Sequence, residues 1–157
     1  MRTAHSSHSP LPPQRRADAG RELSLLSVVI PCYNESAGLE RLHEALVPVL
    51  ESAAPAFEIV LVDDGSRDDT FAVARKLAAR DRRVKALRFA RNFGKEAGMA
   101  AGLAAASGDA VVLMDADLQH PPGFIPEMID AWRRGVDMVI AVRRDRTTDS
   151  WARSAIS

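Results

Sequence analysis

Two aspartates, Asp115 and Asp117, directly follow a short apolar run, Ala110 to Met114. Residues two apart in an extended chain point to the same side, so both carboxylates can face one ligand. Two like charges this close repel each other, and ionising both is costly unless a cation lies between them. The spacing therefore predicts a divalent metal at the carboxyl end of a central strand, presented to a phosphate-bearing substrate.

The expected metal is Mg²⁺ or Mn²⁺, held by Asp115 and Asp117. Such an ion keeps several waters, bridges phosphate oxygens and acts as a Lewis acid on a diphosphate leaving group. A nucleotide could be held at the same place if Asp64 accepts from a base N–H and Glu35 from ribose hydroxyls. The sequence has neither a Gly-x-x-x-x-Gly-Lys-Ser/Thr loop nor a Gly-x-Gly-x-x-Gly after its first strand, which argues against nucleotide hydrolases and dinucleotide cofactors.

The elements that must position these residues alternate between strand and helix, with short links. Apolar runs bounded by turn residues predict the strands, and apolar residues at helical spacing predict the helices between them. This alternation predicts an α/β fold, in which a mostly parallel sheet is covered by helices on both faces. Within the first helix, Pro48 is expected to cause a kink or an end. The expected strands are Leu23–Pro31, Phe57–Val62, Val84–Ala90, Ala110–Met114 (buried on both faces) and Val136–Val142.

Ligands of such sheets bind beyond the carboxyl ends of the strands, and polar clusters follow each predicted strand. We expect these clusters to converge on one site. They are Tyr33-Asn34-Glu35, Asp63-Asp64, Arg91 to Lys95, Asp115 to Gln119 and Arg143 to Arg146.

Several of these residues also have a purely structural interpretation. Asp63 either caps a turn or takes part in function. Asp68 is interpreted as a helix-start charge, and Cys32 as a packing residue. Lys95 stands at a helix start, where a cation is unfavourable; it either binds an anion, and so belongs to the nucleotide-binding set, or is a solvated lysine. The strand-end position of Arg143 favours phosphate contact.

The length and composition of the chain are those of one globular domain. The chain has 157 residues, 46% of them hydrophobic, and equal numbers (21 each) of basic and acidic side chains. This balance provides no argument for nucleic acid or an anionic membrane as a partner. No window is apolar enough to span a membrane. Residues 1–22 lack hydrophobic periodicity, which predicts a disordered tail. Residues 23–146 are expected to form the domain, and residues 147–157 show no clear element. A single cysteine and no secretory signal favour a cytoplasmic location.

Three motifs occur in this order: Pro31-Cys32-Tyr33-Asn34-Glu35, Asp63-Asp64-Gly65-Ser66 and Asp115-Ala116-Asp117. Together they resemble the motifs of the family 2 glycosyltransferases of the GT-A fold. Three further segments narrow the resemblance to the polyprenol-phosphate sugar transferases. They are Arg91-Asn92-Phe93-Gly94-Lys95-Glu96, Asp117-Leu118-Gln119 and the Arg143 to Arg146 end. These include dolichol-phosphate mannosyltransferases and undecaprenyl-phosphate glycosyltransferases.

The resemblance implies roles for individual residues. Contacts to the nucleoside would come from Pro31, Tyr33, Glu35, Val62 and Asp64. The diphosphate, metal and sugar would be handled by Asp115, Ala116, Asp117 and Gln119, and Arg143 would face the phosphates. The implied reaction is inverting, metal-dependent transfer from a UDP- or GDP-linked sugar to a polyprenyl phosphate.

Members of that family continue well beyond the point where this chain stops, with acceptor-side residues and usually transmembrane helices. The expectation is therefore a nucleotide-sugar-binding domain whose membrane contact would come only through a missing second half. The alternative is an inactive nucleotide-sugar-binding remnant.

A phosphoryl-accepting signalling domain would need its acidic pair after the first strand. A haloacid-dehalogenase-type phosphatase would need its Asp-x-Asp on the first strand, so placement argues against both.

Overall fold

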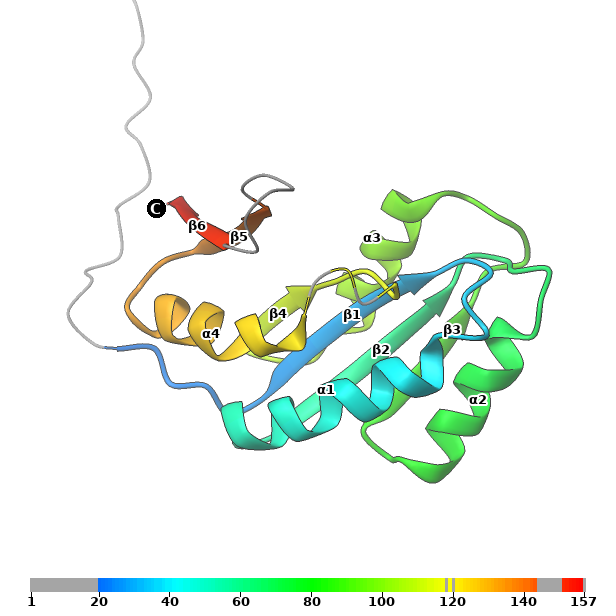
Figure 1. The fold of residues 1–157 in the computed structure, drawn as a ribbon, viewed down its shortest axis with the longest axis horizontal. Coiled ribbons are helices and arrows are strands. Elements are labelled where there is room, and N and C mark those ends of the chain that lie inside the picture. The colour runs from blue at the N-terminus through cyan, green and yellow to red at the C-terminus, as the bar shows by residue number, and fades with distance from the viewer. Residues whose placement is uncertain (1–19, 118, 120, 144–150, 157) are drawn as a thin grey trace, which may run out of the picture.

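The computed structural model describes residues 20–117, 119, 121–143 and 151–156, and for residues 142, 143 and 151–156 only the backbone. Strands and helices alternate as predicted up to the fifth described strand, which is followed directly by a sixth (Figure 1). The elements, in order, are β1 Leu26–Cys32, α1 Leu39–Ala53, β2 Phe57–Asp63, α2 Thr70–Arg80, β3 Val84–Arg88, α3 Lys95–Ala105, β4 Ala110–Leu113, a 3-10 turn η1 Pro122–Phe124, α4 Ile125–Arg133, β5 Met138–Arg143 and β6 Trp151–Ile156.

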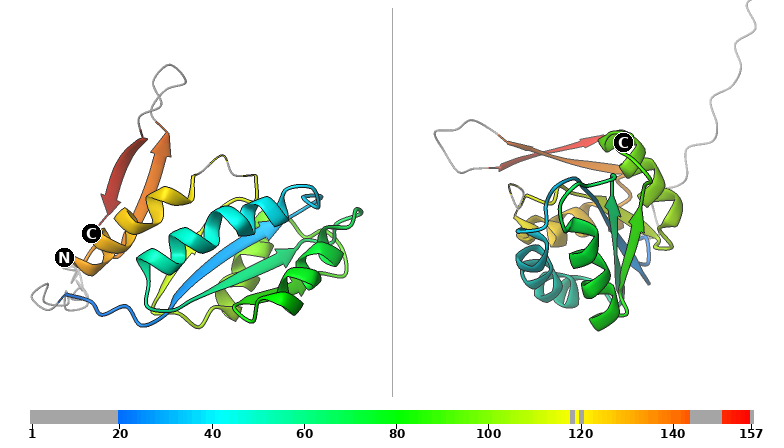
Figure 2. Two further views of the ribbon diagram at one scale, coloured as in Figure 1. Left: turned by 60° about the horizontal axis from the view of Figure 1, so that its bottom comes forward. Right: turned by 90° about the vertical axis from the view of Figure 1, so that its right-hand side faces the viewer.

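Four strands form a parallel sheet in the order β3-β2-β1-β4. Helices α1, α2 and α4 lie on one face and α3 on the other (Figures 1 and 2). All four strands therefore end at the same edge of the sheet. This confirms the predicted α/β architecture with helices on both faces.

The two inner strands alternate between two cores. On one face, Val28 and Ile30 of β1 pack with the buried leucines of α1, while on the other face Val29, Val60 and Val62 meet α3. Every residue of β2 is buried. Strands buried on both faces read as continuous apolar runs, which is why β1 and β2 were predictable.

Helix α3 lies close to the sheet because it presents glycines to it. A Cβ on Gly102 would stand 2.2 Å from Cγ1 of Val29, and one on Gly98 would stand 3.2 Å from Cβ of Pro31. Without side chains at these two positions the helix face is smooth, so its backbone can approach the sheet this closely.

Strand β4 differs from its prediction. It pairs only with β1 and is an edge strand of the described sheet, with Val111 and Leu113 38% and 46% exposed. The expectation of a central strand buried on both faces is wrong. An apolar run indicates that a surface needs cover, but it does not indicate which neighbour provides the cover.

The predicted fifth parallel strand is also wrong. β5 pairs antiparallel with β6 in a separate two-stranded sheet, with Met138 opposite Ile156 and Arg143 opposite Trp151. β6 lies in the segment 147–157, for which no element was expected. A strand's apolar pattern does not reveal its partner, and here the partner is near in sequence. Arg144 to Thr147 and most of the predicted N-terminal tail lie outside the described residues.

Helix α1 continues through Pro48 to Ala53, so of the two expected effects of Pro48, a kink or an end, the end is wrong. The buried residues Leu39, Leu42, Leu46 and Leu50 anchor both halves of the helix to the core. Packing of an amphipathic face outweighs the local cost of the proline. Among the described residues, no helix is long and apolar enough to cross a bilayer.

Pro48→Ala is expected to raise the free energy of unfolding by about 1–3 kcal/mol, measured by urea denaturation. The exposed Pro48 ring buries little surface, and alanine restores a backbone N–H inside the helix. Pro55→Ala, outside the helix, is the matched control and gains nothing. Equal or lower stability of Pro48→Ala would contradict the claim that Pro48 destabilises α1 locally.

Candidate functional site

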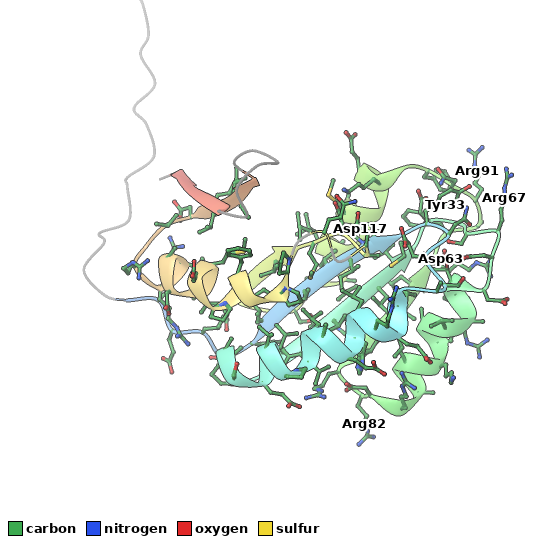
Figure 3. All side chains as sticks on the ribbon, viewed as in Figure 1. Tyr33, Asp63, Arg67, Arg82, Arg91 and Asp117 are labelled. Atoms are coloured by element: carbon green, nitrogen blue, oxygen red, sulfur yellow. The ribbon has the colours of Figure 1, made fainter. Side chains whose placement is uncertain are left out.

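A cavity of about 330 Å³ opens at the carboxyl ends of β1, β2 and β4. Figure 3 shows Tyr33 and Asp117 toward this end of the sheet, with Arg82 at the opposite side of the molecule. The cavity is lined by Pro31, Cys32, Tyr33, Glu35, Asp64, Asn92, Gly94, Lys95, Asp115, Ala116 and Asp117.

Most of the predicted site residues meet in this cavity: Pro31, Tyr33, Glu35, Asp64, Lys95, Asp115, Ala116 and Asp117. Val62 does not line it, because its side chain is fully buried against α3. Gln119 is exposed and also lies outside the lining, although its backbone N–H donates to Oδ1 of Asp117 at 3.0 Å. The side chain of Arg143 lies outside the described structure.

Asp64 joins the second strand to the loop after β3. Its two carboxylate oxygens accept hydrogen bonds from the backbone N–H groups of Phe93, at 2.7 Å, and Gly94, at 2.9 Å. Its side chain is buried, yet it faces the cavity. A carboxylate oxygen has a second lone pair, so Asp64 can hold the loop and still accept from a ligand.

Asp63 has the structural role that was one of its two interpretations. Its Oδ1 accepts from the backbone N–H of Ser66 at 3.0 Å, and its Oδ2 lies 3.2 Å from Nε of Arg88. Asp63 is fully buried and does not line the cavity. It shapes the turn that presents Asp64.

The loop after β1 is tied to the loop after β2 by hydrogen bonds. The backbone N–H of Asn34 donates to Oγ of Ser66 at 2.9 Å, and Oδ1 of Asn34 accepts from the N–H of Arg67 at 2.9 Å. The N–H of Glu35 donates to Oγ1 of Thr70 at 2.8 Å. These bonds fix the backbone that carries Tyr33 and Glu35 against the backbone that carries Asp64.

Asp68 completes this connection between the two loops and is more than a helix-start charge. Its Oδ2 accepts from the N–H of Ser36 at 3.2 Å, and its Oδ1 from the N–H of Thr70 at 3.0 Å. Desolvation raises the pKa of Asp68, but hydrogen bonds from Thr70 and Ser36 outweigh it and lower the pKa to about 2. A depressed pKa means that the connection is complete at neutral pH and weakens only as the pH falls toward that value.

Asn34 adopts a left-handed backbone conformation, with φ 56°. Asn34→Ala is expected to lower the free energy of unfolding by about 1–3 kcal/mol, since it removes a hydrogen bond and adds left-handed strain. Asn34→Gly removes the same hydrogen bond without that strain, so the gap between the two variants isolates the strain. Chemical denaturation measures both. Equal stability of the two variants would contradict the strain argument.

Lys95, the first residue of α3, forms an ion pair with Asp115, which lies just beyond β4. The lysine thus has an anion beside it, although that anion is a carboxylate of the chain. Asp117 lines the same cavity and is exposed.

The residues at this point fit a divalent metal that also binds substrate. Asp115 and Asp117 both line the cavity, and the described residues hold no group of three or more His, Cys, Asp or Glu placed to bind an ion. Mg²⁺ and ions like it are bound by one or two carboxylates together with waters and substrate phosphates. This donor set therefore fits Mg²⁺ or Mn²⁺ shared with a phosphate ligand.

Cys32 is a buried residue of the cavity lining. Burial, together with the nearby carboxylates of Asp63 and Glu35, raises the pKa of its thiol to about 12. The thiol is therefore neutral and not nucleophilic at ordinary pH, in line with the packing role predicted for it.

The sequence motifs did not predict site roles for Asn92 and Gly94 in the lining, or for Asn34, Ser66 and Thr70 in the loop connection. All of these residues except Thr70 lie within the motifs quoted above. Asn34 carried a further signal, because asparagine tolerates the left-handed region better than most residues.

Comparison with known proteins identifies the family of this chain. The family model "Glycosyl transferase family 2" matches residues 27–156. The chain is 44% identical to the bactoprenol glucosyl transferase of Shigella phage SfV, covering 79% of the chain and 40% of that protein. It is also 44% identical to an uncharacterized glycosyltransferase of Synechocystis, covering 82% of the chain and 40% of that protein.

Among solved structures, the chain resembles glucosyl-3-phosphoglycerate synthase from Mycobacterium tuberculosis in complex with UDP. The TM-score is 0.61 and the identity 26%, over 85% of this chain and 49% of that one. It shares its fold with the mannosyltransferase PcManGT from Pyrobaculum calidifontis in complex with GDP-Man and Mn²⁺, with TM-score 0.61 and 20% identity over 85% of this chain and 41% of that one.

The chain spans about 40% of the length of the curated relatives it matches. The match to the family model extends over most of the chain and includes every strand end that lines the cavity. The chain belongs to glycosyl transferase family 2.

Proposed function

We propose that this chain binds the nucleotide-sugar donor in the transfer of a sugar to a polyprenyl phosphate. The observation that carries the proposal is that Tyr33, Glu35 and Asp64 line the same cavity as Lys95, Asp115 and Asp117. The first three residues offer an aromatic ring and hydrogen-bond acceptors, and the last three offer two carboxylates and a cation. A nucleoside diphosphate needs both sets.

On the nucleoside side, the half-exposed Tyr33 ring provides a surface for stacking on a base. Asp64 accepts from a base N–H with its remaining lone pairs, and Glu35 accepts from ribose hydroxyls. Since Asp64 also holds the backbone at Phe93 and Gly94, binding of the base is linked to the loop that leads to Lys95.

On the phosphate side, a divalent metal ion at Asp115 and Asp117 would act as Lewis acid on the departing diphosphate. Lys95 provides a further positive charge beside the same group. The acceptor is a phosphate monoester, already anionic near pH 7, so it needs positioning more than a general base.

In the proposed reaction, an oxygen of the acceptor phosphate forms a bond to the anomeric carbon while the bond from that carbon to the nucleotide diphosphate breaks. Attack opposite the leaving group inverts the anomeric centre. Relatives named bactoprenol glucosyl transferase support the acceptor class and favour glucose as the first sugar to test.

The test has two stages. Calorimetric titration of the chain with UDP and with GDP, in Mn²⁺ or in EDTA, is expected to show metal-dependent binding of one of them. Incubation with the matching nucleotide sugar and a short polyprenyl phosphate then measures transfer, and NMR gives the anomeric configuration of the product. If neither nucleotide binds, the proposal is wrong. Binding without transfer would place the acceptor steps elsewhere in a longer protein and limit this chain to donor binding.

A further inference from the structure

The ion pair between Lys95 and Asp115 occupies the place where the metal is proposed to bind. Lys95 is the first residue of α3, and its Nζ contacts Oδ1 of Asp115, which lies just beyond β4. Both residues line the 330 Å³ cavity. The carboxylate proposed as a metal ligand thus already carries a cation supplied by the chain itself.

The ion pair between Lys95 and Asp115 is weak enough to be displaced. Its lysine and aspartate side chains are 59% and 35% exposed, and ion pairs open to water are weak. Lys95 also stands where the helix dipole disfavours a cation. A divalent ion can therefore displace the ammonium group, provided that it gains enough contacts of its own.

The chain alone offers few such contacts. In the part of the chain that the structure describes, no third acidic, histidine or cysteine side chain joins Asp115 and Asp117 around one point. A divalent metal must complete its shell with waters and substrate phosphates. Lys95 and the metal therefore compete for Asp115, and a diphosphate favours the metal in two ways: it adds metal ligands, and it offers the released ammonium group a new anionic partner in the same cavity.

We propose that Lys95 is an internal counter-ion that holds Asp115 until a nucleoside diphosphate arrives, and then transfers from Asp115 to the phosphates as the metal binds. This inference rests on the proposed function and deepens it, since it makes Lys95 a positioning residue that couples metal binding to donor binding. The metal would be bound weakly without nucleotide and tightly with it.

The test measures Mn²⁺ affinity from the electron paramagnetic resonance signal of free Mn²⁺, with and without UDP or GDP. Lys95→Met is expected to raise the nucleotide-free affinity for Mn²⁺ about tenfold, the change expected when a unit charge is removed a few ångströms from a divalent ion in a wet site. Lys95→Arg keeps the charge and stays within about twofold of the unmodified chain.

Lys76→Met is the matched control. It removes the same charge from an exposed lysine on α2 that pairs with Glu40, and it should leave Mn²⁺ affinity unchanged. Adding Asp115→Asn to Lys95→Met should abolish the gain, which would assign the gain to this carboxylate. The factor by which nucleotide raises Mn²⁺ affinity should also be smaller in Lys95→Met than in the unmodified chain.

The outcomes separate the two proposals. If the unmodified chain binds nucleotide with Mn²⁺ but Lys95→Met has unchanged or weaker nucleotide-free Mn²⁺ affinity, the counter-ion role is wrong and the proposed function stands. A gain equal to that of Lys76→Met would mean a general charge effect and would also overturn the role. If no variant binds either Mn²⁺ or nucleotide, both proposals are wrong.

Discussion

Asp117→Asn is expected to weaken Mn²⁺-dependent binding of the preferred nucleotide by at least about a hundredfold, since even residues outside the first shell of a metal contribute ten- to a hundredfold to its affinity. The side chains have nearly the same shape, so the change removes a charge and a ligand while conserving volume. Asp117 is exposed, and the unfolding midpoint should therefore stay unchanged. Calorimetric titration with UDP or GDP in Mn²⁺ measures the loss.

Asp130→Asn is the matched control. Asp130 is exposed on α4, 3.7 Å from Arg133, and its replacement should leave nucleotide binding intact. If Asp117→Asn binds nucleotide as tightly as this control does, in the presence of Mn²⁺, Asp117 is not a metal ligand and the proposed metal site is wrong.

Gly65→Ala is expected to lower the free energy of unfolding by about 2–4 kcal/mol, because it combines left-handed strain with a clash against backbone. Gly65 has φ +66°, and a Cβ there would stand 2.4 Å from the carbonyl carbon of Arg91 and 2.6 Å from the backbone nitrogen of Asn92. Neither atom can move without displacing the loop that Asp64 holds. Chemical denaturation measures the stability, and nucleotide titration is expected to show weakened binding.

Two other glycines separate the causes. Gly94 has φ +96°, but a Cβ there would meet no other part of the described chain within 4 Å, so Gly94→Ala adds strain without a clash. Gly123 has neither feature. The expected order of destabilisation is Gly65→Ala, then Gly94→Ala, then Gly123→Ala. Equal losses at Gly65 and Gly94 would contradict the close approach of the two loops.

The fold was predictable where burial leaves a pattern in the sequence. β2 is buried along its whole length, so its apolar run is continuous, and the leucines of α1 recur at helical spacing because only one face of that helix meets the core. Pairing partners leave no such pattern. The edge position of β4 and the antiparallel pairing of β5 with β6 depend on how the chain crosses over and on which segments lie nearby.

The candidate site, like the fold, could be predicted only in part. Parallel strands end at one edge, so Asp64 and Asp117 were expected to share a cavity, and both line it. The contacts that hold the site together depend on geometry that spacing does not encode. The left-handed conformation of Asn34 brings its side chain to Arg67, and the turn at Gly65 lets the loop at Arg91 pass close by.

Paramagnetic broadening of backbone NMR signals by Mn²⁺, with and without the preferred nucleoside diphosphate, tests most directly whether metal and nucleotide share one site. With nucleotide present, substoichiometric Mn²⁺ is expected to broaden the signals of residues 32–35, 64–65, 92–95 and 115–117 together, and to leave those of the distant α2–β3 turn sharp. Broadening confined to other surfaces, or broadening at 115–117 with no effect on 64–65, would contradict a shared site for the metal and the nucleotide.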